Sequence, residues 1–473
     1  MSAWDSPTET EASGRLAGSL AVPAPLRHRL AIVSTSNKLC GIAAYTQALE
    51  GYLGDIFDVR VFDLDQYLLR GRHKRVRTLG DRHIKAICRE IAGFDAVNIQ
   101  LEYGTLGATP RDICRRFAWL AAAAPRVSVT FHTLKRPPLF PLGDFIGALV
   151  TLRWRTVGDI YGEFARSRAL SLQIPRRLRQ AQRRKPVCAI VHNRRDRSDL
   201  QHLGGLHSVF DHPLAFLPES RAQTVQASVT RQRFPLLEAL PRDAVLTGVF
   251  GFINDYKGFS TAVRALHHLS PRHHLLIFGG THPNEIPARQ PIHSHVQSLL
   301  HEAYLSGWPP GDEGEGRRKP ATKPGGLGED ASSHPVAGRV HFMGVLDDDD
   351  FLAGMALCDV VVFPYMEVGQ SSSGPIAIAV ELGKRIIASR THAFLDFAAY
   401  HPLTIEFFDI GNHLELAKRI AARRQYPARR EPPLFNVETN KAVYLAANSA
   451  PAAAEAIRRG RPRLQRTIVG AQR

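Results

Sequence analysis

The chain is poor in cysteine and lacks long apolar runs. Five cysteines are scattered over 473 residues without paired metal-ligand spacing: Cys40, Cys88, Cys114, Cys188 and Cys358. Neither a disulfide framework nor a structural metal site is therefore expected. No apolar stretch reaches about 18 residues, so no transmembrane helix is predicted. Residues 1–27 carry early acids and no apolar signal core, and we expect a disordered tail on a cytoplasmic protein.

Acidic residues are also in short supply, with 44 Asp and Glu against 61 Lys and Arg and a net charge of +17. Such an excess predicts an anionic partner: membrane lipid, nucleic acid or a phosphorylated acceptor. Residues 166–185 concentrate the charge, and residues 145–164 before them are apolar and aromatic. We predict that 150–185 contacts an anionic membrane surface peripherally, on its inner face. The alternative is a solvated basic helix and connector.

The length exceeds one ordinary core and suits two domains. Strand-like and helix-like runs alternate from Leu30, and a second alternating set begins near Val245. This alternation predicts an α/β fold with parallel sheets built from βαβ units. The predicted organisation is a first domain over 28–225, a second over 243–430 with a flexible insertion at 306–338, a helix within 431–460, and a basic tail over 461–473.

The segment from Pro364 to Asp396 is the most informative part of the sequence. A strand-like run ending at Tyr365 leads into a Gly/Ser loop, and an apolar helix begins at Pro375. Free N–H groups and the dipole at a helix start favour a phosphate, and the loop hydroxyls add donors. Proline suits the first helical position. The alternative is an ordinary serine-rich helix cap.

Three further segments precede this one, GVFGFINDYKGFSTAVRAL (248–266), LLIFGG (275–280) and RVHFMGVL (339–346). In order and spacing, 245–396 resembles the donor-binding domain of retaining GT-B glycosyltransferases (glycosyltransferase group 1, family 4-like). The resemblance implies two Rossmann-like, doubly wound domains facing a central cleft, with the 431–460 helix returning to the first. It also implies hexose transfer from a nucleotide-diphosphate sugar to an acceptor hydroxyl, without cofactor or metal.

The resemblance also assigns the donor site. Lys257 would supply positive charge to the leaving diphosphate, and further donor contacts would come from Gly41, Gln370, Ser371, Ser372, Ser373, Gly374 and His392. Two departures stand out. Phe252 occupies the place of a usual arginine, and the usual pair of glutamates is replaced by Gln370 and Ile378. A solvated turn lysine remains the alternative for Lys257, and a simple turn for Gly41.

Two residues of the first half are candidate catalytic groups. His132 ends a predicted strand and resembles a family residue beside the transferred sugar, where it could orient a hydroxyl or stabilise charge. Glu102 also ends a predicted strand and could bind the acceptor, assist proton removal or cap the next helix. His192–Asn193 and 211–213 are weaker candidates for the cleft. The acidic run 347–350 is predicted to start a helix rather than hold a metal.

Three interpretations follow. The first is a glycosyltransferase of polysaccharide or glycolipid biosynthesis, acting on a saccharide or lipid-linked acceptor. The missing arginine and glutamates support a second, a non-catalytic GT-B-fold sugar- or nucleotide-binding partner in a polysaccharide assembly complex. The third is a nucleic-acid-associated protein, based on charge alone. No specific nucleic-acid partner is predicted, because no helix-turn-helix, zinc or RNP-type signature is present.

Overall fold

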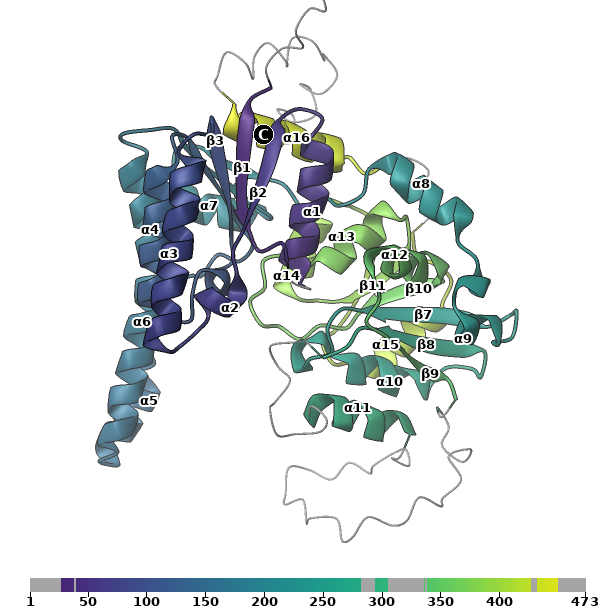
Figure 1. Ribbon diagram of the computed structural model, residues 1–473. Helices are drawn as coiled ribbons and strands as arrows, with labels where there is room; N and C mark the ends of the chain where they lie inside the picture. Colours follow the sequence, from purple (N-terminus) through teal and green to yellow (C-terminus); the bar gives the residue numbers. More distant parts are fainter. Residues whose placement is uncertain are drawn as a thin grey trace, which may run out of the picture.

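A computed structural model describes residues 27–37, 40–281, 294–304, 336, 338–426 and 432–449. Two six-stranded parallel sheets lie one in each half of the chain (Figure 1). This arrangement confirms the predicted α/β fold class of two Rossmann-like domains. The predicted tails and the insertion at 306–338 lie outside the described residues, except for residues 27, 336 and 338.

The first sheet has the order β2-β1-β3-β4-β5-β6. Its strands are β1 (Arg29–Ser34), β2 (Asp58–Asp63), β3 (Ala96–Leu101), β4 (Val127–Phe131), β5 (Val187–Val191) and β6 (Val209–Asp211). Its helices are α1 (Gly41–Leu53), α2 (Gln66–Leu69), α3 (Lys74–Ile91), η1 (Tyr103–Thr105), α4 (Pro110–Ala123), α5 (Leu142–Val150), α6 (Trp154–Ala181) and α7 (Arg194–His202). The central strands are buried along their whole length, because helices cover both faces of a parallel sheet.

The second sheet has the order β12-β11-β10-β7-β8-β9. Its strands are β7 (Val245–Phe250), β8 (His273–Phe278), β9 (Val340–Gly344), β10 (Val360–Phe363), β11 (Arg385–Ser389) and β12 (Ile405–Phe408). The helices from Glu219 onward are α8 (Glu219–Ser228), η2 (Arg231–Arg233), α9 (Pro235–Glu238), η3 (Asp255–Lys257), α10 (Phe259–Leu266), α11 (Ser294–Tyr304), α12 (Asp348–Leu357), α13 (Gly374–Glu381), α14 (His392–Ala398), α15 (His413–Ala421) and α16 (Val437–Asn448). Because α8 packs against α12, the chain enters the second domain before residue 225.

The last described helix, α16, lies on the first domain, against α1, β3, β4 and β5. The buried face of α16 carries polar side chains among its apolar ones. Asn440 donates to the hydroxyls of Tyr45 and Tyr52 (3.0 and 2.7 Å), and the Tyr444 hydroxyl bonds the side chains of Gln100 and Thr130. A segment more than 200 residues past the first domain thus completes that domain's packing.

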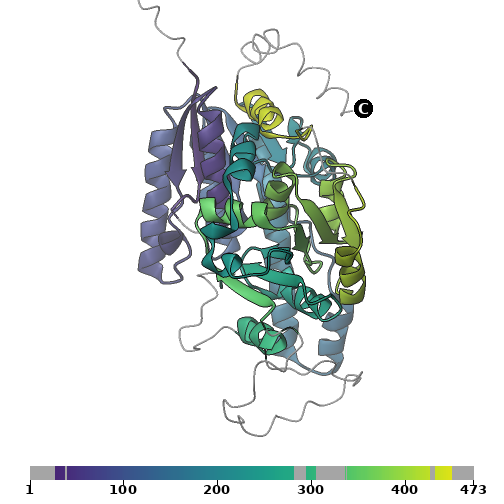
Figure 2. The same cartoon turned by 90° about the vertical axis from the view of Figure 1, so that its right-hand side faces the viewer.

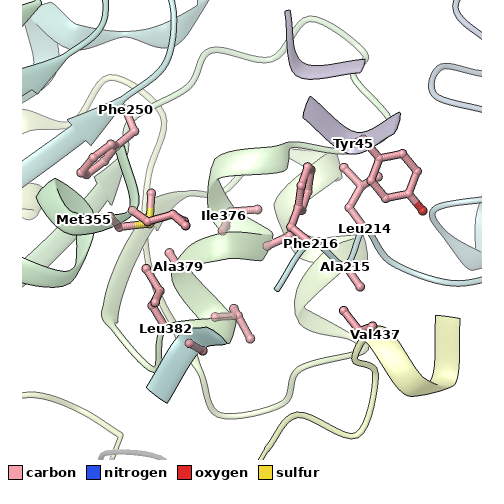
Figure 3. Close-up of a cluster of buried hydrophobic side chains, with 14 of the residues drawn as sticks. Tyr45, Leu214, Ala215, Phe216, Phe250, Met355, Ile376, Ala379, Leu382 and Val437 are labelled. Atoms are coloured by element: carbon pink, nitrogen blue, oxygen red, sulfur yellow. The ribbon is translucent and has the colours of Figure 1, made fainter. Parts of the chain in front are cut away.

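A single apolar cluster runs from one domain into the other. Figure 3 shows Tyr45 of α1 and Phe216 of the connecting segment beside Ile376 of α13 and Val437 of α16. All four side chains are buried. The Tyr45 and Phe216 rings meet edge to face at 5.3 Å. The two domains therefore share a core at their junction, where they meet around the site described below.

Helices α5 and α6 form a hairpin that extends beyond the rest of the first domain (Figure 1, Figure 2). Phe140 packs against Phe145 and Phe164 inside it, with ring centroids 5.0 and 4.9 Å apart. Across the described parts of the chain, no helix combines the length and apolarity that a membrane crossing needs. Most of the predicted patch at 150–185 lies in one long helix, α6. The apolar and aromatic segment of the patch lies at the start of this helix, and most of its arginines lie toward the end.

Candidate functional site

A cavity of about 410 Å³ lies between the two domains, where the carboxyl ends of strands from both sheets meet. Eight predicted site residues line it: Gly41, Glu102, His132, Lys257, Gln370, Ser372, Ser373 and Gly374. They come from segments as much as 330 residues apart in the sequence. The structure thus brings most of the predicted donor site and both predicted catalytic side chains to one cavity.

Ser371 and His392 lie outside the lining of this cavity. Ser371 is buried between the domains, where its hydroxyl accepts from the Leu134 N–H and its carbonyl accepts from the Asn193 side chain (both 3.3 Å). His392 is exposed at the start of α14, and its backbone N–H donates to Glu367 (2.7 Å). Ser371 therefore joins the serine loop to the first domain, and His392 faces solvent.

Lys257 is a buried cation at the end of η3, with 6% of its surface exposed. Its amino group bonds the Tyr365 hydroxyl and lies 3.9 Å from the centre of that ring. Burial lowers the pKa of Lys257 to about 7. Among the described residues, no carboxylate forms an ion pair with this group. An anion entering the cavity would restore the full charge of the lysine.

Glycine is required next to this lysine. Gly258 has a φ of 62°, and a Cβ atom on it would come within 1.9 Å of the Pro364 carbonyl oxygen. A left-handed backbone without a side chain therefore lets η3 approach the strand-end segment that carries Tyr365. The Lys-Gly pair identified in the sequence is thus a packing requirement as well as a source of charge.

Helix α13 supplies the second polar element of the cavity. It begins at Gly374 with Pro375 in its first turn, and no side chain caps its first N–H groups. The Ser373 hydroxyl bonds the Tyr365 hydroxyl instead (3.3 Å). Free N–H groups and the dipole of α13 therefore point at the cavity close to Lys257, which favours a bound phosphate.

His132 is held by a chain of buried side chains. Gln100 donates its amide to Asn98 and to the Tyr444 hydroxyl, so its oxygen accepts from His132 Nε2 (2.8 Å). Burial, and then the nearby His192, hold the pKa of His132 well below its ordinary value. The imidazole is neutral at pH 7, with Nδ1 as its acceptor. This arrangement suits orientation of a sugar hydroxyl better than stabilisation of negative charge.

Glu102 caps the next helix, as one of its predicted alternatives required, and it also lies at the cavity. Its carboxylate accepts from the Tyr103 N–H (3.1 Å), which caps η1, and the residue also lines the cavity. Burial raises the pKa of Glu102, and its hydrogen bonds oppose that rise. A carboxyl group with a raised pKa at the wall of a cavity is suited to proton exchange with a hydroxyl.

The weaker candidates lie behind the cavity rather than on its wall. His192 is buried beside His132, with ring centroids 5.3 Å apart. Asn193 caps α7. Asp211 accepts from the Tyr400 hydroxyl (2.6 Å), and His212 bonds Thr439 (2.8 Å). These four side chains connect the domains and α16 behind the site.

Asp348 is a cavity residue that the sequence did not single out. Asp347 caps α12 by accepting from the Asp350 N–H (2.8 Å), as the predicted helix start requires. The next residue, Asp348, lines the cavity. Phe252 and Ile378, which stand where the resemblance has charged residues, line it too. Among the described residues of the second domain, Asp348 is the one carboxylate that lines the cavity. Within the described ranges, no three His, Cys, Asp or Glu side chains gather to hold a metal ion.

Neither a protein-family model nor a curated protein matches this sequence. Two solved structures match almost the whole chain with a TM-score of 0.54. One is a sucrose-phosphate synthase from Thermosynechococcus elongatus (16% identity, 94% of this chain and 100% of that one). The other is an α,α-trehalose 6-phosphate synthase from Burkholderia multivorans (14% identity, 92% and 98%).

This chain adopts the GT-B fold. A further GT-B structure, a UDP-forming α,α-trehalose-phosphate synthase from Burkholderia xenovorans, matches with a TM-score of 0.50 at 12% identity. It covers 89% of this chain and 98% of its own. Each likeness spans both domains, so it concerns the whole GT-B arrangement of two facing sheets and the cavity between them.

Proposed function

We propose that this GT-B protein is a glycosyltransferase that moves a hexose from a nucleotide-diphosphate sugar to an acceptor hydroxyl. The observation that carries the proposal is the buried Lys257, which has no described carboxylate partner and lies beside the uncapped start of α13. A cationic group and free N–H donors in one cavity match a leaving diphosphate. The GT-B fold of solved sugar transferases agrees with this assignment.

In the proposed reaction, the bond from the anomeric carbon to the diphosphate breaks while negative charge grows on the leaving oxygen. Lys257 and the α13 N–H groups stabilise that charge, and the serine hydroxyls hold the phosphates. His132 accepts from a hydroxyl of the transferred sugar and fixes its position. The acceptor oxygen forms the new bond to the anomeric carbon, and Glu102 takes the proton of the acceptor hydroxyl. We propose that no cofactor or metal is needed, because these groups supply the charge that the step needs. Retention at the anomeric carbon is proposed from the family resemblance alone.

The comparisons support a proposal for the donor class. One matched structure is UDP-forming by its name, and we propose a uridine-diphosphate hexose as donor. The proposed acceptor is a saccharide or a lipid-linked intermediate of polysaccharide or glycolipid biosynthesis, used at the cytoplasmic face of a membrane. The basic and apolar stretch 150–185 supports this location.

A second candidate function is a non-catalytic partner that binds a sugar or nucleotide in a polysaccharide assembly complex. The observation that favours it is the cavity wall itself. Phe252 and Ile378 both face the cavity, so the arginine and glutamate of the resembled family have no direct substitutes at those two positions. Such a protein would bind a nucleotide without turning it over.

Calorimetric titration with UDP, GDP, ADP and their glucose conjugates tests both proposals. We expect saturable binding of one nucleotide, lost in Lys257→Met and in Ser372→Ala/Ser373→Ala. Lys418→Met, at an exposed position of α15, is the matched control and should bind normally. Sugar release that disappears in His132→Ala while binding persists supports the transferase. Binding without turnover supports the partner, and absence of any binding to the folded protein contradicts both.

A further inference from the structure

The hairpin of α5 and the first half of α6 projects away from the packed body of the first domain. The buried residues of α6 begin at Leu170, so the sixteen residues from Trp154 to Ala169 have no fully buried side chain. At 1.5 Å per residue, this half of α6 spans about 24 Å. In both views it extends past the end of α3 (Figure 1, Figure 2). The hairpin presents its tip, residues 150–155, to the surroundings of the molecule.

The tip is apolar and exposed. Val150, Leu152 and Trp154 are exposed by 76%, 69% and 64%. Leu152 also has a φ of 55°, a left-handed conformation that favours Gly or Asn over a bulky apolar residue. Packing does not explain large apolar side chains at these three positions. Clustered exposed apolar groups of this kind mark an interaction surface.

Positive charge surrounds the tip. Arg153 and Arg155 alternate with its apolar residues and are exposed. A second group, which we term the basic block, consists of Arg70 and Arg72 in the connection after α2 and of Lys74 and Arg75 at the start of α3. Its side chains are exposed, form no ion pair with any described residue, and have no acid among residues 66–80. The basic block lies at the end of the domain from which the hairpin projects (Figure 1).

We propose that this end of the first domain docks on an anionic lipid bilayer. The tip inserts Val150, Leu152 and Trp154 into the interfacial region, and the arginines around them contact the headgroup phosphates. Tryptophan prefers this depth of a membrane, and each nearby Lys or Arg adds attraction to an anionic surface. A second copy of this chain is a poorer occupant, because it would bring a like-charged surface against the basic block.

The proposal narrows the membrane-contacting segment that the sequence indicated. The arginine run that starts at Arg176 lies about 33 Å along α6 from Trp154, since 22 residues separate them. It therefore cannot contact a flat surface together with the inserted tip if the hairpin stands upright. The tip arginines, which lie beside the inserted residues, take its place as the anionic-lipid contact, and the basic block joins them when the hairpin tilts toward the start of α3.

Docking in this orientation has a consequence for the cavity between the domains. The segment from Thr133, which lines the cavity, leads directly to α5. The hairpin thus connects the acceptor side of the cavity to the bilayer surface. This consequence rests on the proposed function: an acceptor anchored in the membrane would meet the cleft near the hairpin.

Flotation of the full-length protein with vesicles tests the docking. Vesicles of phosphatidylcholine with 30% phosphatidylglycerol should bind it, and pure phosphatidylcholine vesicles should bind it at least tenfold less. We expect Val150→Ser/Leu152→Asn/Trp154→Ser to lose at least tenfold in affinity. Replacing the four residues of the basic block with Gln should do the same. Quenching of tryptophan fluorescence by brominated lipid should fall in Trp154→Phe.

Matched controls separate the tip from general effects. Leu403→Asn changes a leucine of similar φ (58°) and exposure (71%) in the second domain, and Arg183→Gln/Arg184→Gln removes charge at the far end of α6. Both should bind vesicles as the unmodified protein does. Absence of vesicle binding by the unmodified protein, or full binding by the tip variant, overturns the proposal. The proposal is also overturned if sedimentation shows a dimer that dissociates in the tip variant while vesicle binding stays unchanged. Nucleotide titration is independent of vesicles, so it reports separately on the proposed function.

Discussion

At the scale of single residues, the burial of Lys257 lowers the stability of the fold and at the same time favours binding of an anion. The protein buries an amino group whose pKa falls to about 7 and offers it no described carboxylate. A bound diphosphate would supply the missing negative charge and raise the pKa again. Binding should therefore draw a proton from solution whenever the pH lies above 7.

We expect this proton uptake to be measurable with UDP-glucose, whose phosphates do not titrate near neutral pH. At pH 8.5 it should approach about one proton per site, and affinity should fall by up to about tenfold per pH unit above 7. Calorimetry in two buffers of different ionisation enthalpy measures the uptake. In Lys257→Met the uptake should vanish along with most of the affinity. Equal apparent enthalpies for the unmodified protein would contradict the role of Lys257.

The burial of Lys257 also predicts that the folded protein gains stability as the pH rises. The unfolded chain holds this proton up to the ordinary lysine pKa of 10.5, whereas the folded chain releases it near 7. The cost of burying the charge is therefore complete below pH 7 and disappears as the pH rises through 10.5. Lys257→Met, similar in volume, should melt at a higher temperature than the unmodified protein at pH 6. The difference should shrink toward pH 10, and a variant less stable at pH 6 would refute this.

Asp348 is a candidate replacement for the absent second glutamate, because it lines the cavity with a carboxylate from the second domain. We expect Asp348→Asn to weaken nucleotide-sugar binding about tenfold. Asp349→Asn is the control: its exposed carboxylate pairs with Arg221 and lies outside the cavity lining. Calorimetric titration compares the two variants. Equal affinity in both would remove Asp348 from the site.

At the scale of elements, α16 stabilises the first domain through polar contacts. The Tyr444 hydroxyl bonds Gln100 and Thr130 at 3.1 and 3.0 Å inside a fully buried environment. Gln100 in turn bonds His132. The helix therefore supports the orientation of a candidate catalytic side chain that it does not itself contact.

Tyr444→Phe should cost about 1–2 kcal/mol of unfolding free energy, because two buried partners lose a hydrogen bond while the ring remains. Urea unfolding followed by tryptophan fluorescence measures the loss. Tyr161→Phe, at a 60% exposed hydroxyl on α6, should change stability by less than about 0.5 kcal/mol. Equal stability of the two variants would mean that the network contributes nothing.

The sequence predicted the strands well because both faces of these sheets are covered. Runs such as Val127–Phe131 and Val360–Phe363 are wholly buried and read as continuous apolar segments. The contact face of α16 could not be recognised in this way, since Asn440 and Asn448 are polar residues that become buried through specific partners. The projecting half of α6 was equally hidden, because apolar side chains such as Trp154 and Tyr161 are exposed there rather than buried in a core.

The site was predictable where a local motif carries it and hidden where it depends on distant partners. The serine loop follows from strand, turn and helix signals, and Lys257 was assigned by the family resemblance of its segment. The role of Ser371 depends on Leu134 and Asn193, about 180 to 240 residues away, which no local pattern reveals. Asp348 is one of four identical neighbours, and only the direction of α12 distinguishes it.

At the scale of the whole molecule, the two domains meet over a buried carboxyl group. Glu381 of α13 accepts from the N–H groups of Phe216 and Leu217 (2.8 and 3.1 Å) in the segment that connects the domains. Burial raises the pKa of Glu381 to about 8, against the opposing effect of those two donors. The folded protein therefore holds a proton at this junction that the unfolded chain has lost above pH 4.5.

The sign of this linkage predicts a loss of stability with rising pH. Between pH 4.5 and 8 the folded state binds the extra proton, so the contribution of Glu381 falls by up to about 1 kcal/mol per pH unit. Glu381→Gln removes the titration. Relative to the unmodified protein, this variant should gain stability as the pH rises from 5 to 8, measured by thermal melts at each pH. A constant difference across that range would contradict the raised pKa.

The placement of α16 has a consequence for biosynthesis. During synthesis, β1 to β6 leave the ribosome long before residues 437–448 exist, so the first domain waits for its last helix while the entire second domain is translated. Throughout that interval Tyr45, Tyr52, Gln100 and Ser128 lack the cover that α16 provides. A nascent chain arrested after the first domain would expose this unfinished surface. The order of translation thus makes completion of the whole chain a condition for the final packing of its beginning.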